Sequence, residues 1–204
     1  MDASFRVFGD SLAVALDLFF QRWSKPTRKG QAFFDEGFDI ISKLLTLRVA
    51  GEKMLISEVL TPALINTDIE AETKEELFEE MVQMFVNAKL INDRESAVMA
   101  LIEREQKMST GIAPDFALPH GKIAGISGVI MALGIIKKGM DFDSLDDQPV
   151  HVVITLFSEM GNPGPHIEAL SEISRLISIP DFLERLKAAS TPEQILRIIK
   201  SEEL

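Results

Sequence analysis

Cysteine is absent from this chain of 204 residues, and histidine is scarce, with only three. Without cysteine there can be no disulfide, no thiolate nucleophile and no thiolate-ligated metal, and the absence fits a reducing compartment. No apolar run is long enough to cross a membrane. The run Leu12–Phe20 is broken by Asp17 and lacks the basic leader and cleavage site of a secretory signal. We therefore expect a soluble, cytoplasmic protein.

Several catalytic and metal-binding motifs are missing as well. The chain has no glycine-rich phosphate loop with Lys-Ser or Lys-Thr, no His-Glu-x-x-His pair and no Gly-x-Ser-x-Gly elbow. No pair of ligands stands at the short spacing of a zinc site. These absences argue against a P-loop nucleotide site and a bound metal. A Ser-His-Asp triad stays open, because counting residues does not exclude it.

Basic side chains are much fewer than acidic ones after the first quarter of the chain. Residues 1–53 hold 7 acidic and 8 basic side chains, whereas the remainder holds 25 acidic and 13 basic ones and carries nearly all of the net charge of −11. An acidic main domain disfavours nucleic acid as a partner. It suits docking on basic protein surfaces, although solubility alone would explain it.

The first 53 residues have a helical pattern of their own. Apolar side chains recur at helical spacing in Leu12–Trp23, the polar break Lys25–Gly30 follows, and a second helical pattern runs through Phe34–Val49. We predict an α-helical hairpin as a separate N-terminal extension. Its apolar face can pack on the main domain or on itself, form a homo-oligomer interface, or touch a membrane surface through Trp23.

Residues 54–204 are the predicted main domain, in which helical and strand patterns alternate. Two helices begin at a Thr73–Glu76 capping box and at an Asp93 N-cap. Three more begin near proline residues towards the C-terminus. The expected strands are a short one near Leu64–Glu70, Val129–Ile136, and a central one at His151–Phe157. A loop is expected at 108–114 and a turn at 139–142. This order predicts an α/β class, with three α/β/α layers.

His120 stands in an informative local sequence. The apolar run Phe116–Leu118 precedes it, followed by Pro119, and Gly121 comes directly after it. Pro119 fixes its own φ and favours an extended residue before it, whereas Gly121 permits a sharp change of direction. We predict that His120 lies at the end of a strand, at the mouth of a turn, where a partner can reach it.

Other polar residues have two interpretations each. His166 stands in the first turn of a helix, where the dipole favours its neutral form; it either faces water or belongs to an anion site. Arg104 is either a helix-end cation or a clamp for a phosphoryl or carboxylate group. Ser109 and Thr110 either donate to an anion or stabilise their loop. His151 is expected at the rim of the sheet.

The segment around Arg104 and His120 resembles the enzyme IIA domain of the fructose–mannitol type of the bacterial phosphoenolpyruvate-dependent phosphotransferase system, including its nitrogen-regulatory branch. The resemblance covers about residues 55–202. The similar stretches are Arg104-Glu105, Ser109–Gly111, Ala117–Gly121, Gly139–Phe142, Asp146–Val150 and His166–Leu170. One arginine and two histidines in this order, 16 and 46 residues apart, make it specific.

The resemblance implies a mixed sheet with helices on both faces and a protein-histidine phosphotransferase. His120 matches the phosphoryl acceptor, His166 the assisting histidine, and Arg104 the arginine that stabilises the phosphoryl group. The donor would be the carrier HPr or a paralogue, and no metal or cofactor is required. The acceptor would be a IIB domain in sugar uptake; alternatively, the protein is purely regulatory and binds partners according to its phosphorylation state. The absence of a fused IIB or IIC domain slightly favours regulation.

Three residues depart from the family pattern. Ala113 and Asp115 stand where the family often has glycine, and Phe116 replaces a smaller aliphatic residue. Asp115 is expected to add negative charge near the phosphate site and so to alter phosphorylation.

Overall fold

The computed structural model describes residues 54–144 and 146–203, and it confirms an α/β fold with a mixed sheet. The predicted helical hairpin, the domain boundary near residue 53 and the oligomer surface all lie outside the described residues. The elements follow in the order α3 (Ile56–Val59), η1 (Pro62–Leu64), β1 (Ile65–Asn66), α4 (Lys74–Asn87), α5 (Arg94–Glu105), β2 (Gly111–Ala113), β3 (Asp115–Ala117), β4 (His120–Ile123), β5 (Val129–Met140), β6 (Val150–Glu159), α6 (Pro163–Ile177), α7 (Phe182–Ala188) and α8 (Pro192–Glu203).

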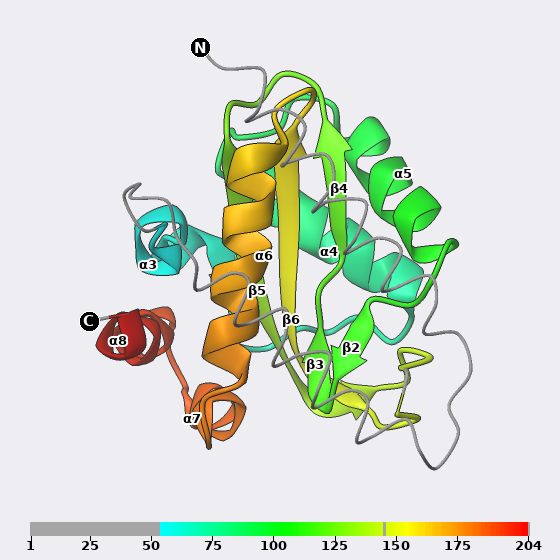
Figure 1. The fold of residues 1–204 in the computed structure, drawn as a ribbon. Coiled ribbons are helices and arrows are strands. Elements are labelled where there is room, and N and C mark those ends of the chain that lie inside the picture. Colours follow the sequence, from blue (N-terminus) through cyan, green and yellow to red (C-terminus); the bar gives the residue numbers. More distant parts are fainter. Residues whose placement is uncertain (1–53, 145, 204) are drawn as a thin grey trace, which may run out of the picture.

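Strand β6 is the centre of the sheet, as its sequence predicted. It pairs antiparallel with β5 on one side and parallel with both β3 and β4 on the other. The outer pairs are β1 parallel to β5 and β2 antiparallel to β3. Helix α6 covers one face and α4 the other (Figure 1). A strand covered on both faces can be apolar throughout, which explains the run at 152–157.

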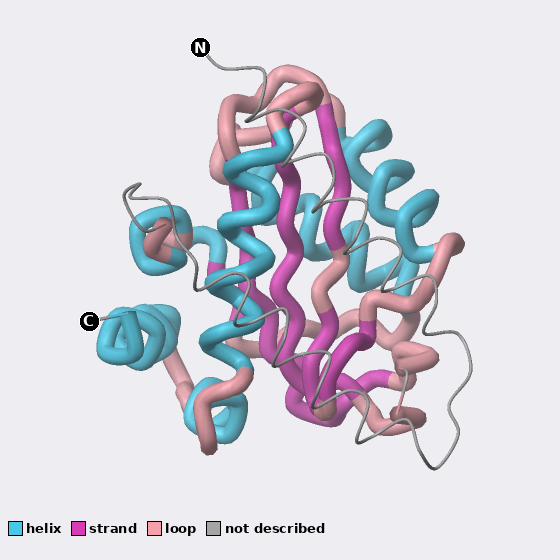
Figure 2. Tube along the Cα trace, viewed as in Figure 1, coloured by secondary structure: helices cyan, strands magenta, loops and turns pink. Residues whose placement is uncertain are grey.

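On the side of β6 opposite β5, two short strands, β3 and β4, pair with β6 one after the other. Strand β3 ends at Ala117, opposite Val153, and β4 begins at His120, opposite Leu156. Figure 2 shows the break between them as a short loop. The Leu156 N–H donates to the Pro119 carbonyl at 3.0 Å, so the edge stays attached across the break. Pro119 itself has no N–H to donate, which suits a position on a sheet edge.

The prediction that His120 lies at the end of a strand, before a turn, was wrong. His120 begins β4, and Gly121 continues the strand. The glycine is needed for packing instead, because a Cβ atom at this position would lie 3.2 Å from Cβ of Ala100 in α5. Such a close approach of helix and strand favours a residue without a side chain.

Two further local predictions need correction. The expected loop 108–114 contains strand β2, and the expected turn 139–142 lies partly within β5, which continues to Met140. Gly139 has a φ of +70° inside that strand. Strand β2 has only three residues and depends on its pairing with β3, which begins two residues after β2 ends. The end of β5 depends on its pairing with β6. A local pattern does not reveal such pairings.

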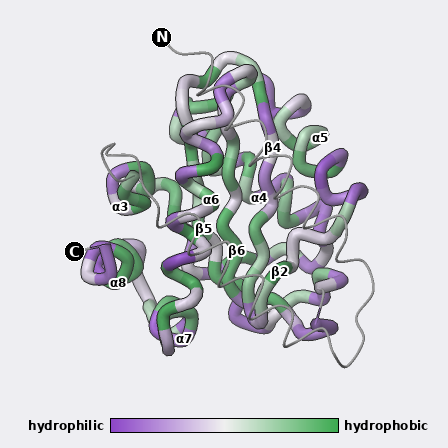
Figure 3. Tube along the Cα trace, in the orientation of Figure 1, coloured by the Kyte–Doolittle hydropathy of each residue, from purple (hydrophilic) through white to green (hydrophobic). Residues whose placement is uncertain are grey.

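The helix starts and the core agree with the sequence. Thr73 and Glu76 form the predicted capping box, and Asp93 accepts from the Ser96 N–H at 3.0 Å. On the core side, Phe85 from α4 meets Phe157 from β6 edge to face, with ring centroids 5.4 Å apart. Figure 3 shows that hydrophobic residues gather along the strands and inner helix faces.

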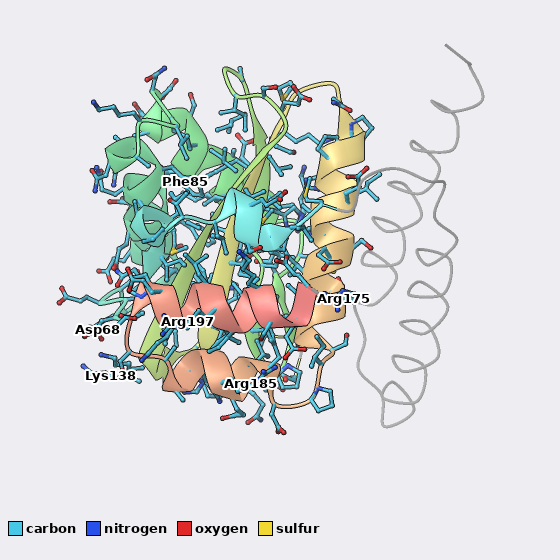
Figure 4. All side chains as sticks on the ribbon, turned by 90° about the vertical axis from the view of Figure 1, so that its left-hand side faces the viewer. Asp68, Phe85, Lys138, Arg175, Arg185 and Arg197 are labelled. Carbon is cyan, nitrogen blue, oxygen red and sulfur yellow. The ribbon has the colours of Figure 1, made fainter. Side chains whose placement is uncertain are left out.

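The C-terminal helices close the remaining side of the domain, which Figure 4 shows face on. Arg185 of α7 donates to the Glu202 carboxylate at 2.6 Å, and Arg175 of α6 donates to the Glu202 carbonyl at 2.9 Å. The Glu203 carboxylate accepts from the backbone N–H groups of Ile56 and Ser57. The end of the domain is thereby tied to α3 at its start. None of the described helices has the length and apolar character that crossing a membrane requires.

Candidate functional site

Three elements bring Arg104, His120 and His166 together. Arg104 lies in the last turn of α5, His120 is the first residue of β4, and His166 lies in the first turn of α6. Strand β4 is at the sheet edge between these helices (Figure 1). The three side chains are neighbours, as the predicted site requires; their chemical roles remain predictions.

Both ring nitrogens of His120 have a partner of fixed polarity. Nδ1 lies 2.8 Å from the Leu118 carbonyl, and Nε of Arg104 lies 3.0 Å from Nε2. A carbonyl can only accept and a guanidinium can only donate. The ring proton is therefore on Nδ1, and the lone pair of Nε2 points at Arg104. This is a neutral imidazole with Nε2 as its nucleophilic atom.

The surroundings keep His120 neutral. Burial lowers its pKa to about 3, and the positive charge of Arg104 contributes to the decrease. The Leu118 carbonyl acts in the opposite direction but is outweighed. An unprotonated ring at neutral pH is the form that can attack an electrophile.

His166 faces the ring of His120. The two ring centroids are 5.6 Å apart and the planes are tilted by 50°. Nδ1 of His166 is buried and has no hydrogen-bond partner within the described part of the chain. Burial, followed by the charges of Lys122 and Arg104, lowers the pKa of His166 to about 4. The predicted neutral form is thus confirmed, but burial rather than the helix dipole is the main cause.

Ser109 and Thr110 have partners within the protein. The Ser109 hydroxyl donates to the Phe142 carbonyl at 3.1 Å, and the Thr110 hydroxyl donates to the Glu105 carboxylate at 2.6 Å. In this state both hydroxyl protons are bound within the protein, and neither is available to a bound phosphoryl group. Their predicted support of a bound phosphate would require these bonds to be exchanged.

The expected effect of Asp115 on the site is not what the structure shows. Asp115 begins β3, five residues before His120, which in extended chain corresponds to roughly 16 Å. Its carboxylate binds His151 at 2.5 Å and Lys187 at 3.0 Å. Although burial opposes ionisation, the hydrogen bonds from Lys187 and His151 lower the pKa of Asp115. The negative charge of Asp115 is thus compensated by Lys187 at the start of β3, away from His120 at the start of β4.

Two of the three departures from the family pattern, Asp115 and Phe116, have structural explanations. Asp115 has a φ of +64°, a left-handed conformation that glycine adopts freely and aspartate adopts more readily than most residues. Phe116 is fully buried in the core. His151, expected at the rim, is the second residue of β6 and belongs to the Asp115 cluster.

The electrostatics of the site favour a group with negative charge. Arg104 contacts His120 directly, and the charge of Lys122 is felt at His166, while both histidines are neutral. No group of three or more potential metal-binding side chains occurs in the residues that the structure describes. Sequence reasoning missed two backbone carbonyls of the site, that of Leu118, which accepts from His120, and that of Met108, which accepts from Nη1 of Arg104 at 3.1 Å. Backbone groups give no side-chain signal in the sequence.

Known proteins match most of the chain. Residues 58–202 match the family model described as phosphoenolpyruvate-dependent sugar phosphotransferase system, EIIA 2. The fructose-specific EIIABC component of Bacillus subtilis (strain 168) is 36% identical over 150 residues, which are 74% of this chain and 24% of that protein. The chain thus spans about a quarter of that relative's length.

Solved structures share the fold. The nitrogen regulatory protein IIA-Ntr from Neisseria meningitidis matches with a TM-score of 0.66 and 28% identity, covering 71% of this chain and 98% of that one. A chain in the complex of mannitol enzyme IIA with phosphorylated enzyme IIB from Escherichia coli matches with a TM-score of 0.59 and 18% identity, covering 70% and 97%. At 18% identity the likeness shows the fold alone.

Proposed function

Because the chain belongs to the EIIA 2 family of the phosphoenolpyruvate-dependent sugar phosphotransferase system, we propose that it is a phosphocarrier that accepts a phosphoryl group on Nε2 of His120. The observation that carries this role is the hydrogen-bonding of the ring. Nδ1 donates to Leu118, so the lone pair is on Nε2, where Arg104 supplies a positive charge. A nucleophile and a cation at one point suit phosphoryl transfer.

The transfer requires no proton to leave His120. Its Nε2 attacks the phosphorus of a phosphohistidine on HPr or a paralogue. The new N–P bond forms as the donor N–P bond breaks, and the electron pair of that bond returns to the donor ring. The ring of His120 becomes cationic while keeping its proton on Nδ1, where the Leu118 carbonyl stabilises it. The reverse sequence passes the group to an acceptor.

The neighbouring side chains then act on the phosphoryl oxygens. Arg104 gives up its hydrogen bond to Nε2 and donates to the incoming oxygens, for which its planar guanidinium is suited. The buried Nδ1 of His166 has no partner among the described residues, and in its protonated tautomer it would donate to another oxygen. Positioning and charge stabilisation account for most catalysis in such transfers.

Two destinations for the phosphoryl group have support. The first is a IIB domain in sugar uptake, as suggested by the fructose-specific EIIABC relative. The second is regulation, in which the phosphorylation state selects a partner protein, as suggested by the nitrogen regulatory neighbour. In either case we place the protein in the cytoplasm and assign phosphotransfer to residues 54–204. Residues 1–53 would be a helical extension that can form a homo-oligomer.

The phosphocarrier role is tested by incubating the protein with radiolabelled phosphoenolpyruvate, enzyme I and HPr. We expect acid-labile label on wild-type protein and none on His120→Ala. The paralogue of HPr is tried as a second donor. Equal labelling of wild type and His120→Ala, or no labelling of wild type with either donor, would show that the assignment is wrong.

A pull-down separates the two destinations. His120→Ala represents the unphosphorylated state, and His120→Glu places a negative charge at the same position. Recovery of a IIB protein supports sugar transport. Recovery of a kinase, a transporter subunit or another regulator by one form only supports the regulatory role.

A further inference from the structure

Glu105, the last residue of α5, lies where a helix disfavours an acidic side chain. The unsatisfied carbonyls at a helix C-terminus carry partial negative charge. Even so, the side chain is only 9% exposed. Its carboxylate accepts from the Thr110 N–H at 3.1 and 3.2 Å and from the Thr110 hydroxyl at 2.6 Å. A carboxylate so far removed from water is stable only because such donors replace the water.

Lys74 supplies the positive charge that this carboxylate needs. Its Nζ lies 3.0 Å from Glu105 and 3.0 Å from the exposed Asp143. Burial acts to lower the pKa of Lys74, but hydrogen bonds to Asp143 and Glu105 outweigh it and raise the pKa. Lys74 is the first residue of α4 and therefore joins the start of α4 to the end of α5.

One path of hydrogen bonds leads from Glu105 to Nδ1 of His120. The Thr110 carbonyl accepts from the Leu118 N–H at 2.9 Å. The Leu118 carbonyl accepts from Nδ1 of His120 at 2.8 Å. This last bond keeps the ring proton on Nδ1. The position of Thr110, which Glu105 holds, thus helps to decide which nitrogen of His120 is the nucleophile.

A second path leads from the same carboxylate to Nε2. Because Glu105 binds Thr110, it closes residues 105–110 into a tight loop. Inside that loop the Met108 carbonyl accepts from Nη1 of Arg104 at 3.1 Å. With Nη1 held there, Nε of Arg104 points at Nε2 of His120. Both ring nitrogens are positioned by one short segment whose ends Glu105 joins.

We propose that Glu105 is a positioning residue for phosphoryl transfer, with Lys74 and Thr110 as its partners. This role rests on the function proposed above for His120. Glu105 contacts neither histidine and acts through the Leu118 carbonyl and the Arg104 side chain. Without the Glu105 carboxylate, the tautomer of the His120 ring and the position of the Arg104 guanidinium would both be less well defined. A displacement of about 1 Å in such a site can slow a reaction about 100-fold.

Four single variants of the full chain test this role. Glu105→Gln removes the charge with little change of shape, and Glu103→Gln makes the same change at an exposed position of the same turn. Thr110→Val removes the hydroxyl and Thr110→Ser keeps it. Rapid quench with phospho-HPr gives kcat and KM. Proton–nitrogen correlation spectra of the histidine rings report the tautomer of His120 without any donor.

We expect Glu105→Gln and Thr110→Val to lower kcat about 10- to 100-fold, to leave KM for phospho-HPr unchanged and to give His120 a mixture of tautomers. Glu103→Gln should match wild type. Thr110→Ser should restore the Nδ1–H tautomer and a rate within about threefold of wild type.

Two results would contradict the positioning role of Glu105. If Glu105→Gln is folded and keeps the wild-type kcat, Glu105 is not a positioning residue. The same holds if kcat falls while the ring spectra stay unchanged, because the role would then be structural only. If Glu105→Gln does not fold, kcat and the ring spectra of Thr110→Val and Thr110→Ser decide instead. If wild-type protein accepts no phosphate, the proposed function fails, and the ring spectra alone decide whether Glu105 positions His120.

Discussion

The guanidinium of Arg104 donates through Nε to Nε2 of His120, at 3.0 Å. The cation therefore covers the very atom that is proposed to become phosphorylated. In the resting protein this bond satisfies a lone pair that would otherwise lack a partner. In the proposed transfer the phosphoryl group bonds to Nε2 through this lone pair, and Arg104 donates to the phosphoryl oxygens instead.

Replacing Arg104 tests this relationship. We expect Arg104→Ala to slow transfer from phospho-HPr by about 100- to 1,000-fold, because one preformed donor to the transferred group is lost. Arg104→Lys should recover only part of the rate, since an ammonium cannot reproduce the planar fork. Stopped-flow or rapid-quench kinetics measure the rates, and circular dichroism checks the fold. A rate for Arg104→Ala equal to wild type would leave Arg104 as a helix-end cation.

His166 should contribute less than Arg104. Its ring is 5.6 Å from that of His120, centroid to centroid, and its Nδ1 is buried. We expect His166→Ala to lower the transfer rate about 10- to 100-fold, since one donor to the phosphoryl oxygens is lost. His166→Asn, whose amide can donate from a similar position, should retain more activity. Equal loss in the two variants would argue against a hydrogen-bonding role.

The histidine rings should titrate at unusually low pH. The pKa values of His120 and His166 lie at about 3 and about 4, below the ordinary value of 6.5. We therefore expect their ring carbon–proton signals to stay constant from pH 8 to pH 5 in the folded protein. The same signals in concentrated urea should titrate near pH 6.5. A midpoint above pH 6 for His120 in the folded state would contradict the assignment of a desolvated ring.

Those pKa values also predict how stability depends on pH. Below pH 6.5 the unfolded chain binds protons at both histidines that the folded protein does not bind, so the free energy of unfolding must fall as the pH is lowered. The loss is absent above pH 6.5 and continues towards pH 3 to 4. Between pH 7 and pH 5 each histidine should account for up to about 2 kcal/mol.

Urea unfolding at the two pH values measures this loss in unphosphorylated protein. His120→Gln and His166→Asn should each reduce the difference between pH 7 and pH 5. The window stays above the range in which carboxylates such as Asp93 and Asp115, whose pKa values are lowered, take up protons. A wild-type stability that does not change over this window would refute the prediction.

Asp115 should affect stability and leave transfer unchanged. Asp115→Asn keeps a side chain that tolerates the positive φ but removes the negative charge between His151 and Lys187. We expect the free energy of unfolding to fall by about 1 kcal/mol. The transfer rate should stay within about twofold of wild type, because Asp115 stands five residues before His120, roughly 16 Å along an extended chain. A clear acceleration would mean that its charge does reach the phosphoryl site.

Local sequence signals predicted those parts of the fold that depend on neighbours in the chain. The capping box at Thr73 and the cap at Asp93 are short-range hydrogen bonds, so a few adjacent residues suffice to identify them. The apolar run of β6 likewise predicted its central position in the sheet. Strand β2 escaped notice because three residues form a strand only through their pairing with β3.

Residue types and their order identified candidate site residues, and the resemblance to a known family implied their phosphoryl chemistry. The chain has only three histidines, and one of them, His120, follows an apolar run and a proline. This scarcity left few candidates for a reactive side chain before any geometry was known. Only the tertiary structure showed which nitrogen of His120 carries the proton, that Glu105 binds Thr110, and that Asp115 is paired with His151 and Lys187. The physical reason is that a tautomer, a pKa or an ion pair depends on atoms within a few ångströms. Folding brings those atoms together from α5, β4 and α6, across long stretches of sequence.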